Sequence, residues 1–189
     1  YILFITILCS FSFNGHAQKA KLAAADKKYD NYAYIDAIKT YERVAQKGYK
    51  SVDMFQKLGN AYYFNSDYQN AAKWYAELFA MNTELAPEYY YRYSHSLKSI
   101  GDFKKSDEML ELFNQKSGND SRGKLSKSDY LAEIRANSGR YDVEDAGINS
   151  KYSDYGSTVI DNKVVFCSAR DTGNFSKRIH SWTGQHFTN

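Results

Sequence analysis

The sequence predicts an α + β chain in which an all-α array of about three helix hairpins is followed by antiparallel strands. A pattern of small and aromatic residues recurs after 34 and then 35 residues within residues 18–117, which indicates a helical repeat. Two β-branched runs flank a two-residue turn within residues 141–189, which indicates a β hairpin. An apolar run over residues 1–13 precedes both regions and has the character of an export signal.

Composition places the chain among ordinary globular proteins. Of its 189 residues, 43% are hydrophobic, 25% are charged and one is proline, which excludes collagen and low-complexity disorder. The 25 Lys and Arg residues against 22 Asp and Glu residues leave a formal net charge of +3. Such a small excess does not favour nucleic acid or an anionic membrane as a partner. Two cysteines do not make a disulfide framework.

The first 17 residues predict a signal peptide with a truncated start. Residues 1–13 are almost wholly apolar, and Gly15 and Ala17 supply the small residues at positions −3 and −1 of a cleavage site. A membrane anchor is the alternative, but this run is shorter than the roughly 20 residues that a spanning helix needs. We therefore expect an exported chain that begins at Gln18 after cleavage.

Three tandem units of two helices account for residues 18–117. Tyr34, Tyr68 and Phe103 are equivalent residues of successive units, at intervals of 34 and 35 residues. Small and larger hydrophobic residues follow them at the same spacing in each unit: Ala37, Tyr41, Ala71, Tyr75, Ser106 and Leu110. We expect units at about residues 18–51, 52–86 and 87–117, with Pro87 just inside the first helix of the third unit.

The second unit carries the clearest pattern of a first helix. Phe55, Leu58-Gly59 and Tyr62 are spaced by three and four residues, as one face of a helix requires. Small Gly59 and Ala71 would let the paired helices approach closely. These residues resemble the tetratricopeptide consensus, although Ala24-Ala25 and Tyr93-Ser94 replace the Leu-Gly pair in the outer units. The resemblance implies an all-α tetratricopeptide solenoid of about three helix hairpins.

The same resemblance implies a binding surface, because partner segments of tetratricopeptide proteins usually lie in a concave groove lined by the first helices. The positions that match this groove are Asp26, Asp53, Gln56, Asn60, Tyr63, Phe64, Glu88, Tyr91, His95 and Lys98. Asp26, Asn60 and His95 are equivalent and would form a polar row across the three units. The alternative is that these are merely solvated helix positions.

We expect no catalytic residue, cofactor or metal in this chain. No second His, no Cys and no pair of carboxylates is placed to join His95 in a metal site or as a catalytic base. The chain also lacks a Gly-x-Ser-x-Gly nucleophile elbow. The tyrosine-rich stretch at residues 89–93 could stack bases or sugars, but without a basic stripe beside it a packing role is expected and nucleic acid is not.

After residue 117 the pattern changes. Residues 118–140 form a polar linker with a short helix that carries Glu133 in its first turn and is expected to cap the third unit. Residues 158–160 and 163–168, on either side of Asp161-Asn162, predict the β hairpin. Cys167 in its second strand is expected to be a buried small hydrophobe.

Residues 141–189 resemble the opening blade of a TolB-like, WD-type β-propeller. The matching segments are Asn149-Ser150, Ser153-Asp154-Tyr155 and Phe166 to Asp171. Asp154 and Arg170 are expected to tie turns together through charge-assisted hydrogen bonds. Because a propeller needs about four to eight blades, the resemblance implies an incomplete first blade at the end of an N-terminal fragment.

Export signal, tetratricopeptide array and propeller start, in this order, resemble OmpA-family proteins of Bacteroidota, including members associated with type IX secretion and gliding. The resemblance implies a non-catalytic scaffold at the periplasmic face of the outer membrane. An envelope protein, such as a PorP/SprF-like outer-membrane protein, would occupy the groove, and peptidoglycan would bind only through a C-terminal domain outside these residues. The alternative is the N-terminal part of a secreted, propeller-containing hydrolase or peptidase.

Overall fold

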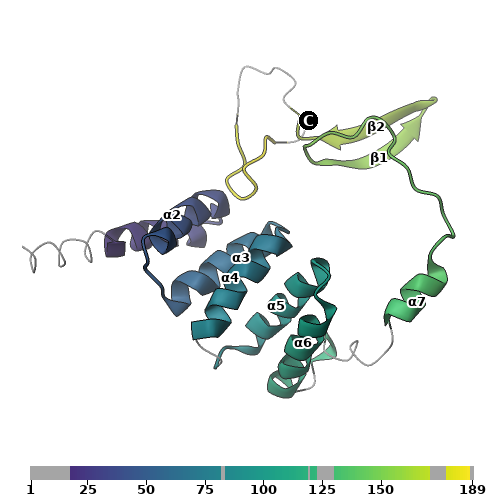
Figure 1. Ribbon diagram of the computed structural model, residues 1–189. Coiled ribbons are helices and arrows are strands. Elements are labelled where there is room, and N and C mark those ends of the chain that lie inside the picture. Colours follow the sequence, from purple (N-terminus) through teal and green to yellow (C-terminus); the bar gives the residue numbers. More distant parts are fainter. Residues whose placement is uncertain (1–17, 82–83, 119, 123–129, 171–177, 188–189) are drawn as a thin grey trace, which may run out of the picture. The chain divides into compact units, whose positions relative to one another are not determined.

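The computed structural model describes residues 18–81, 84–118, 120–122, 130–170 and 178–187 (Figure 1). The chain divides into two compact units, Tyr1–Ser126 and Lys127–Asn189. The predicted signal peptide, residues 1–17, lies outside the described residues. Among the helices that are described, none combines the length and the apolar character needed to cross a membrane.

The first unit is a stack of helix hairpins, which confirms the predicted helical repeat. A helix over residues 18–30 precedes five others: α2 (Tyr34–Gln46), α3 (Val52–Phe64), α4 (Tyr68–Met81), α5 (Pro87–Ser99) and α6 (Phe103–Ser117). The first helices of the second and third hairpins begin at residues 52 and 87, and the described part of the first one starts at residue 18. In Figure 1, α2 to α6 lie side by side, and each packs against the next one along the chain.

The core follows the helical period of the predicted repeat. Tyr41 of α2 and Tyr75 of α4 are equivalent and completely buried. The small residue predicted at position 59 is required by close packing, since a Cβ atom on Gly59 would lie 2.6 Å from a ring carbon of Tyr75. Leu58, the other half of the Leu-Gly pair, is also fully buried. The predicted close approach of α3 and α4 is thus confirmed.

Each hairpin turns through one residue with a left-handed backbone. Tyr32, Ser66 and Gly101 have φ angles of 58°, 59° and 86°. The amide of the next residue bonds back to the first helix in each turn: Ala33 to Lys28, Asp67 to Tyr62 and Asp102 to Leu97, at 2.8, 3.0 and 3.0 Å. In each hairpin, the second helix begins two residues after the residue with positive φ. Successive turns therefore place Tyr34, Tyr68 and Phe103 at the start of each second helix, although Tyr34 is buried there and Phe103 is 36% exposed.

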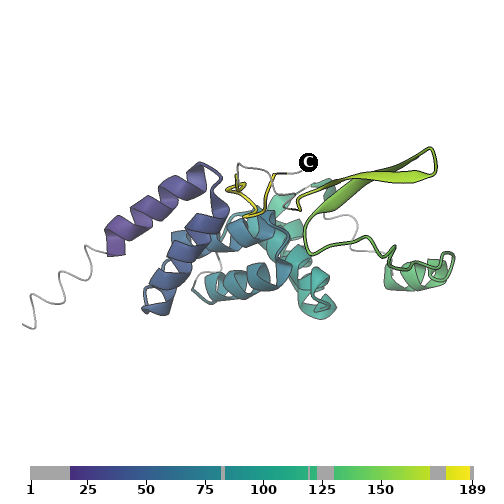
Figure 2. The ribbon, with the colours of Figure 1, turned by 90° about the horizontal axis from the view of Figure 1, so that it is seen from above.

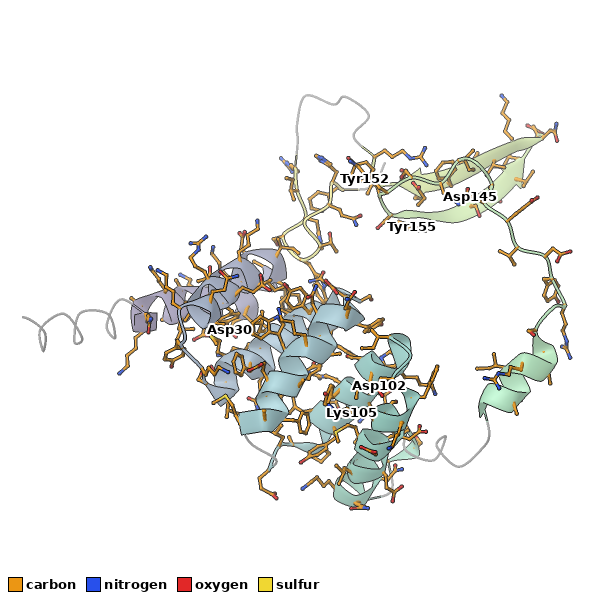
Figure 3. All side chains as sticks on the ribbon, viewed as in Figure 1. Asp30, Asp102, Lys105, Asp145, Tyr152 and Tyr155 are labelled. Carbon is orange, nitrogen blue, oxygen red and sulfur yellow. The ribbon has the colours of Figure 1, made fainter. Side chains whose placement is uncertain are left out.

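Local capping explains where several helices begin. The side chain of Ser51 accepts a hydrogen bond from the amide of Met54 at 3.2 Å, and Pro87 occupies the first turn of α5, as predicted. At the start of α6, Asp102 accepts from the amide of Lys105 at 3.3 Å; both residues are labelled in Figure 3. These caps satisfy amides that have no partner inside the helix.

The second unit contains helix α7 (Tyr130–Asn137) and the predicted hairpin of β1 (Asp154–Ile160) and β2 (Lys163–Ser168), which Figure 2 shows as a two-stranded ribbon. The strands are antiparallel, with Ile160 paired to Lys163 and a bulge between Tyr155 and Thr158. Asp161 and Asn162 both have positive φ, as the favoured two-residue hairpin turn requires. Glu133 lies in the first turn of α7, whose capping role stays a prediction.

The hairpin exposes apolar side chains along its length. Val159 is 71% exposed, and Val164 and Val165 are about half exposed. Cys167 is exposed as well, so the prediction that it is buried was wrong. The reason is that the sheet has two strands within the described residues, and two strands alone cannot bury a face. A propeller therefore stays a prediction.

Candidate functional site

The residues predicted to line a groove all lie on the first helices of the hairpins. Asp26 lies on the helix over residues 18–30, residues 53–64 of the set lie on α3, and residues 88–98 lie on α5. Their exposure differs: Asn60 is buried, Asp53 and Lys98 are exposed, and the other seven are half-buried. Within the part of the chain that the structure describes, no cluster of three or more His, Cys, Asp or Glu residues could hold a metal ion.

Asp26 joins the first two hairpins through hydrogen bonds. Its Oδ1 accepts from the hydroxyl of Tyr41 at 2.6 Å and from Nζ of Lys57, on α3, at 2.8 Å. Lys57 also donates to Oδ2 of Asp53, four residues earlier, at 2.9 Å. Burial raises the pKa of the Tyr41 hydroxyl, and the bond to Asp26 raises it further. The hydroxyl therefore stays protonated and acts as a donor.

The same arrangement recurs one unit later around Asn60. Its Oδ1 accepts from the hydroxyl of Tyr75 at 2.8 Å and from Nη1 of Arg92, on α5, at 2.8 Å. Nε of Arg92 lies 3.3 Å from a carboxylate oxygen of Glu88, four residues earlier. Each residue is equivalent to its counterpart around Asp26. We call these two networks the polar ladder: Asp26, Tyr41, Asp53, Lys57, Asn60, Tyr75, Glu88 and Arg92.

His95 occupies the third equivalent position, but its contacts differ because Leu110 replaces the tyrosine of the second helix. Its Nδ1 lies 3.1 Å from the hydroxyl oxygen of Tyr63 on α3. At this distance the neutral ring can accept a hydrogen bond from that hydroxyl. Burial, and secondarily Lys98, lowers the pKa of His95. The three residues of the predicted polar row, Asp26, Asn60 and His95, therefore occupy equivalent positions on the first helices. Each of them bonds to other side chains within the array.

Sequence reasoning missed the two cationic residues of the polar ladder. Lys57 and Arg92 lie 31 and 32 residues after the oxygens they bind, and 35 residues from each other. That recurrence of a cation at the repeat spacing was the available signal.

Aromatic side chains form a second continuous feature, the aromatic strip. Its members are Tyr29, Tyr32, Tyr34, Tyr63, Phe64, Tyr68, Tyr91, His95 and Phe113. The centroids of contacting rings are 5.1 to 6.3 Å apart, so one chain of ring contacts crosses all three hairpins. Tyr34 and Phe113 are buried, Tyr32 is 60% exposed, and the remaining members are half-buried. Sequence reasoning placed Tyr63, Phe64, Tyr91 and His95 in the site.

Two arginines lie over rings of the strip. The guanidinium of Arg92 lies 5.0 Å from the ring centre of Phe64 and 5.9 Å from that of Tyr63. Arg122 lies 4.6 Å from the ring centre of Tyr91 and also contacts the ring of Phe113. Carboxylates hold both cations: Glu88 contacts Arg92 and Arg122, and Asp120 lies 2.8 Å from Arg122.

In the second unit, the carboxylate of Asp154 gathers four hydrogen bonds. Its donors are the amide and hydroxyl of Ser150, the hydroxyl of Ser168 and Nη2 of Arg170, at 2.6 to 3.0 Å. The hydrogen bond from Ser168 is the largest cause that lowers the pKa of this carboxyl. Arg170 also donates to the carbonyl of Ile148. The predicted tie between Asp154 and Arg170 is confirmed as a hydrogen-bonded contact.

The second unit also has an open hollow of about 260 Å³. Its lining residues are Ser153, Tyr155, Ala169, His180, Thr183, Gln185, His186 and Phe187. Figure 3 labels Tyr155 on β1. Oε1 of Gln185 accepts hydrogen bonds from the amide and the hydroxyl of Ser153. These polar groups of the lining are therefore hydrogen-bonded to each other within the unit.

Comparisons with known proteins assign no function to these surfaces. No family model and no curated protein matches the chain. Among solved structures, PcrH in complex with the chaperone binding region of PopB shares 14% identity at a TM-score of 0.46, over 64% of this chain and 94% of that one. The Yersinia enterocolitica type III secretion translocator chaperone SycD shares 17% identity at a TM-score of 0.44, over 65% and 90%. Both likenesses are too distant to bear on function.

Proposed function

We propose that the helical unit is a non-catalytic docking module that binds a segment of a protein partner across its first helices. The observation that carries the proposal is the aromatic strip, because its contacting rings extend through three hairpins and six of them are half-buried. Tyr and Arg are enriched among the side chains that contribute most binding energy at protein interfaces, and Arg92 and Arg122 lie over the rings.

The polar ladder supports this proposal by making the surface rigid. Lys57 and Arg92 each reach back to the preceding hairpin, so neighbouring units are held by hydrogen bonds as well as by core packing. A surface that is ordered before binding loses less conformational entropy when a partner arrives. The same side chains are engaged within the array, which leaves the rings as the surface for contact.

We further propose the setting that the resemblance implies: a scaffold of the OmpA-family kind, exported to the periplasmic face of the outer membrane, in a longer protein whose C-terminal domain would hold peptidoglycan. The apolar residues 1–13 support export, and the contact between Asp154 and Arg170 supports the propeller-like pattern of the hairpin. Fractionation of cells that express the tagged full-length protein tests this setting. Recovery in the cytoplasmic fraction, with an unprocessed N-terminus, would contradict it.

Site-specific photo-cross-linking tests the docking proposal. A photoreactive amino acid replaces Gln56, which is half-buried on first helix α3, or Lys73, which is exposed on second helix α4. We expect a discrete protein adduct from position 56 in intact cells and none from position 73. The adduct should disappear when Tyr63→Ala is added. No adduct from either position, or equal adducts from both, would overturn the docking proposal.

A further inference from the structure

We infer that Arg122 occupies a guanidinium site on the third hairpin, and that an arginine of the bound partner takes its place there. This inference rests on the proposed docking function and adds to it a partner residue and a regulatory contact. Three observations carry it: the side chains around Arg122, the way Asp120 holds it, and the comparison with the second hairpin.

The site consists of a carboxylate and two aromatic rings. The guanidinium of Arg122 lies 4.6 Å from the ring centre of Tyr91 and 5.2 Å from that of Phe113. Its Nη1 lies 3.1 Å from Oε2 of Glu88. Glu88 and Tyr91 are predicted groove positions on α5, whereas Arg122 follows the end of α6. A residue from beyond the third unit therefore covers a ring of the aromatic strip.

Arg122 can leave this site without losing its counter-ion. Its Nη2 lies 2.8 Å from Oδ2 of Asp120, and its Nε and its backbone amide donate to Oδ1 of the same carboxylate at 3.1 and 2.9 Å. These contacts lie within three consecutive residues, so they move together with Arg122. Glu88 is then the carboxylate that an incoming cation would bind.

The exchange replaces one ion pair by another. The side chains of Arg122 and Glu88 are 39% and 38% exposed. Ion pairs at such exposed positions contribute little net stability, because water solvates both charges when they separate. A partner therefore needs only a small gain in contact elsewhere on the strip to displace Arg122.

The repeat does not account for Arg122. Glu88 already binds Arg92 on its own helix. In the second hairpin the equivalent carboxylate, Asp53, binds Lys57 in the same way. Arg122 is a second cation on Glu88, and it comes from outside the repeated units. We therefore interpret Arg122 as an occupant of the site rather than as a further member of the polar ladder.

The surroundings of Arg122 favour arginine as the residue that replaces it. A guanidinium is planar, so it stacks on an aromatic ring while its N–H groups bind a carboxylate. The ammonium of lysine is a strongly hydrated point charge and matches this combination less well. The partner segment is thus expected to carry an arginine where it crosses α5.

Nuclear magnetic resonance titration of the full chain tests the inference. The probe is the capped pentapeptide Gly-Gly-Arg-Gly-Gly, and the control peptide carries citrulline, which has a similar shape without the charge. We expect Arg122→Ala to bind the arginine peptide about tenfold more tightly than the unaltered chain, since a ring contact and an exposed ion pair together are worth about this factor. The citrulline peptide should show no such gain.

Further variants locate the site. Glu88→Gln or Tyr91→Ala, each added to Arg122→Ala, should remove the gain. Arg43 is an exposed arginine on second helix α2, and Arg43→Ala should leave the affinity at that of the unaltered chain. Circular dichroism identifies any variant that fails to fold, and either of the two added changes alone suffices for the test.

Two results of the titration would overturn the inference. Equal affinity of the arginine peptide for the unaltered chain and for Arg122→Ala would show that Arg122 does not occupy the site. Equal gains for the arginine and citrulline peptides would show that the site does not recognise a cation.

The cross-link from position 56 separates failure of this inference from failure of docking. Adding Arg122→Ala should raise the yield of that adduct about twofold or more, because the site is then free before the partner arrives. An adduct whose yield stays unchanged or falls would overturn the inference and still support docking. The lack of an adduct both with and without Arg122→Ala would overturn the docking function, and this inference with it.

Discussion

Both the helical unit and the β hairpin are built on apolar side chains, but they bury them to very different extents. Tyr75 in the array is completely buried, whereas Val159 in the hairpin is 71% exposed. In a helical repeat, each unit supplies the surface that covers its neighbour, so three units already enclose a core. Within the described residues, the two-stranded sheet has no such neighbour, and side chains on both of its faces stay exposed. Regular secondary structure thus forms in both regions, and the regions differ in how far their apolar side chains are buried.

Truncation of a buried side chain is expected to separate the two regions most strongly. Leu58 is fully buried on α3, so Leu58→Ala should lower the free energy of unfolding by about 2–5 kcal/mol. Val165 is half exposed on β2, and Val165→Ala should cost less than about 0.5 kcal/mol. Urea unfolding followed by circular dichroism measures both. A large cost at Val165 would mean that something covers the hairpin in solution.

The polar ladder is expected to give the next largest effect. Asn60→Ala leaves the buried hydroxyl of Tyr75 without its acceptor, which should cost about 1–3 kcal/mol. Adding Tyr75→Phe removes that hydroxyl and should recover part of the loss. A double-mutant cycle measures this coupling. Strictly additive effects of the two changes would show that the hydrogen bond does not stabilise the array.

The repeated turns predict effects of opposite sign at equivalent positions. Ser66 has a φ of 59°, so Ser66→Gly should stabilise the array by roughly 0.5–1 kcal/mol. Gly101 has a φ of 86° and open space around it, so Gly101→Ala should destabilise it by about 1 kcal/mol through the backbone alone. Thermal unfolding measures both shifts. Shifts of the same sign would contradict the equivalence of the turns.

The smallest effect expected is a difference in pH dependence. The pKa of His95 is lowered from 6.5 by burial, so the unfolded chain binds the extra proton and the array loses stability as the pH falls through about 6.5. The pKa of Asp154 is lowered from 3.8, so its stabilisation of the hairpin is lost only as the pH falls below about 3.8.

Nuclear magnetic resonance spectra recorded across this pH range would follow each unit separately. His95→Gln should remove the effect near pH 6.5, and Asp154→Asn should remove the effect in acid. Loss of both units in a single pH window would contradict their assignment to separate groups.

Much of the fold was predictable because its determinants are local. The spacing of Phe55, Leu58 and Tyr62 is that of one helix face, and the Asp161-Asn162 turn determines the register of the strands around it. Cys167 was misplaced because strand propensity says that a residue lies in a strand and does not say whether another layer covers that strand.

The candidate site was only partly predictable. Tyr63 and His95 were placed on the first helices from the repeat, but their contact with each other, and the contacts of Asn60 with Tyr75 and Arg92, were not. The amino-acid order determines periodicity, helix ends and turns, since these depend on neighbours within a few residues. Pairing across units depends on the angle and distance at which hairpins stack, which whole-unit packing sets. That geometry assembles the polar ladder and the aromatic strip.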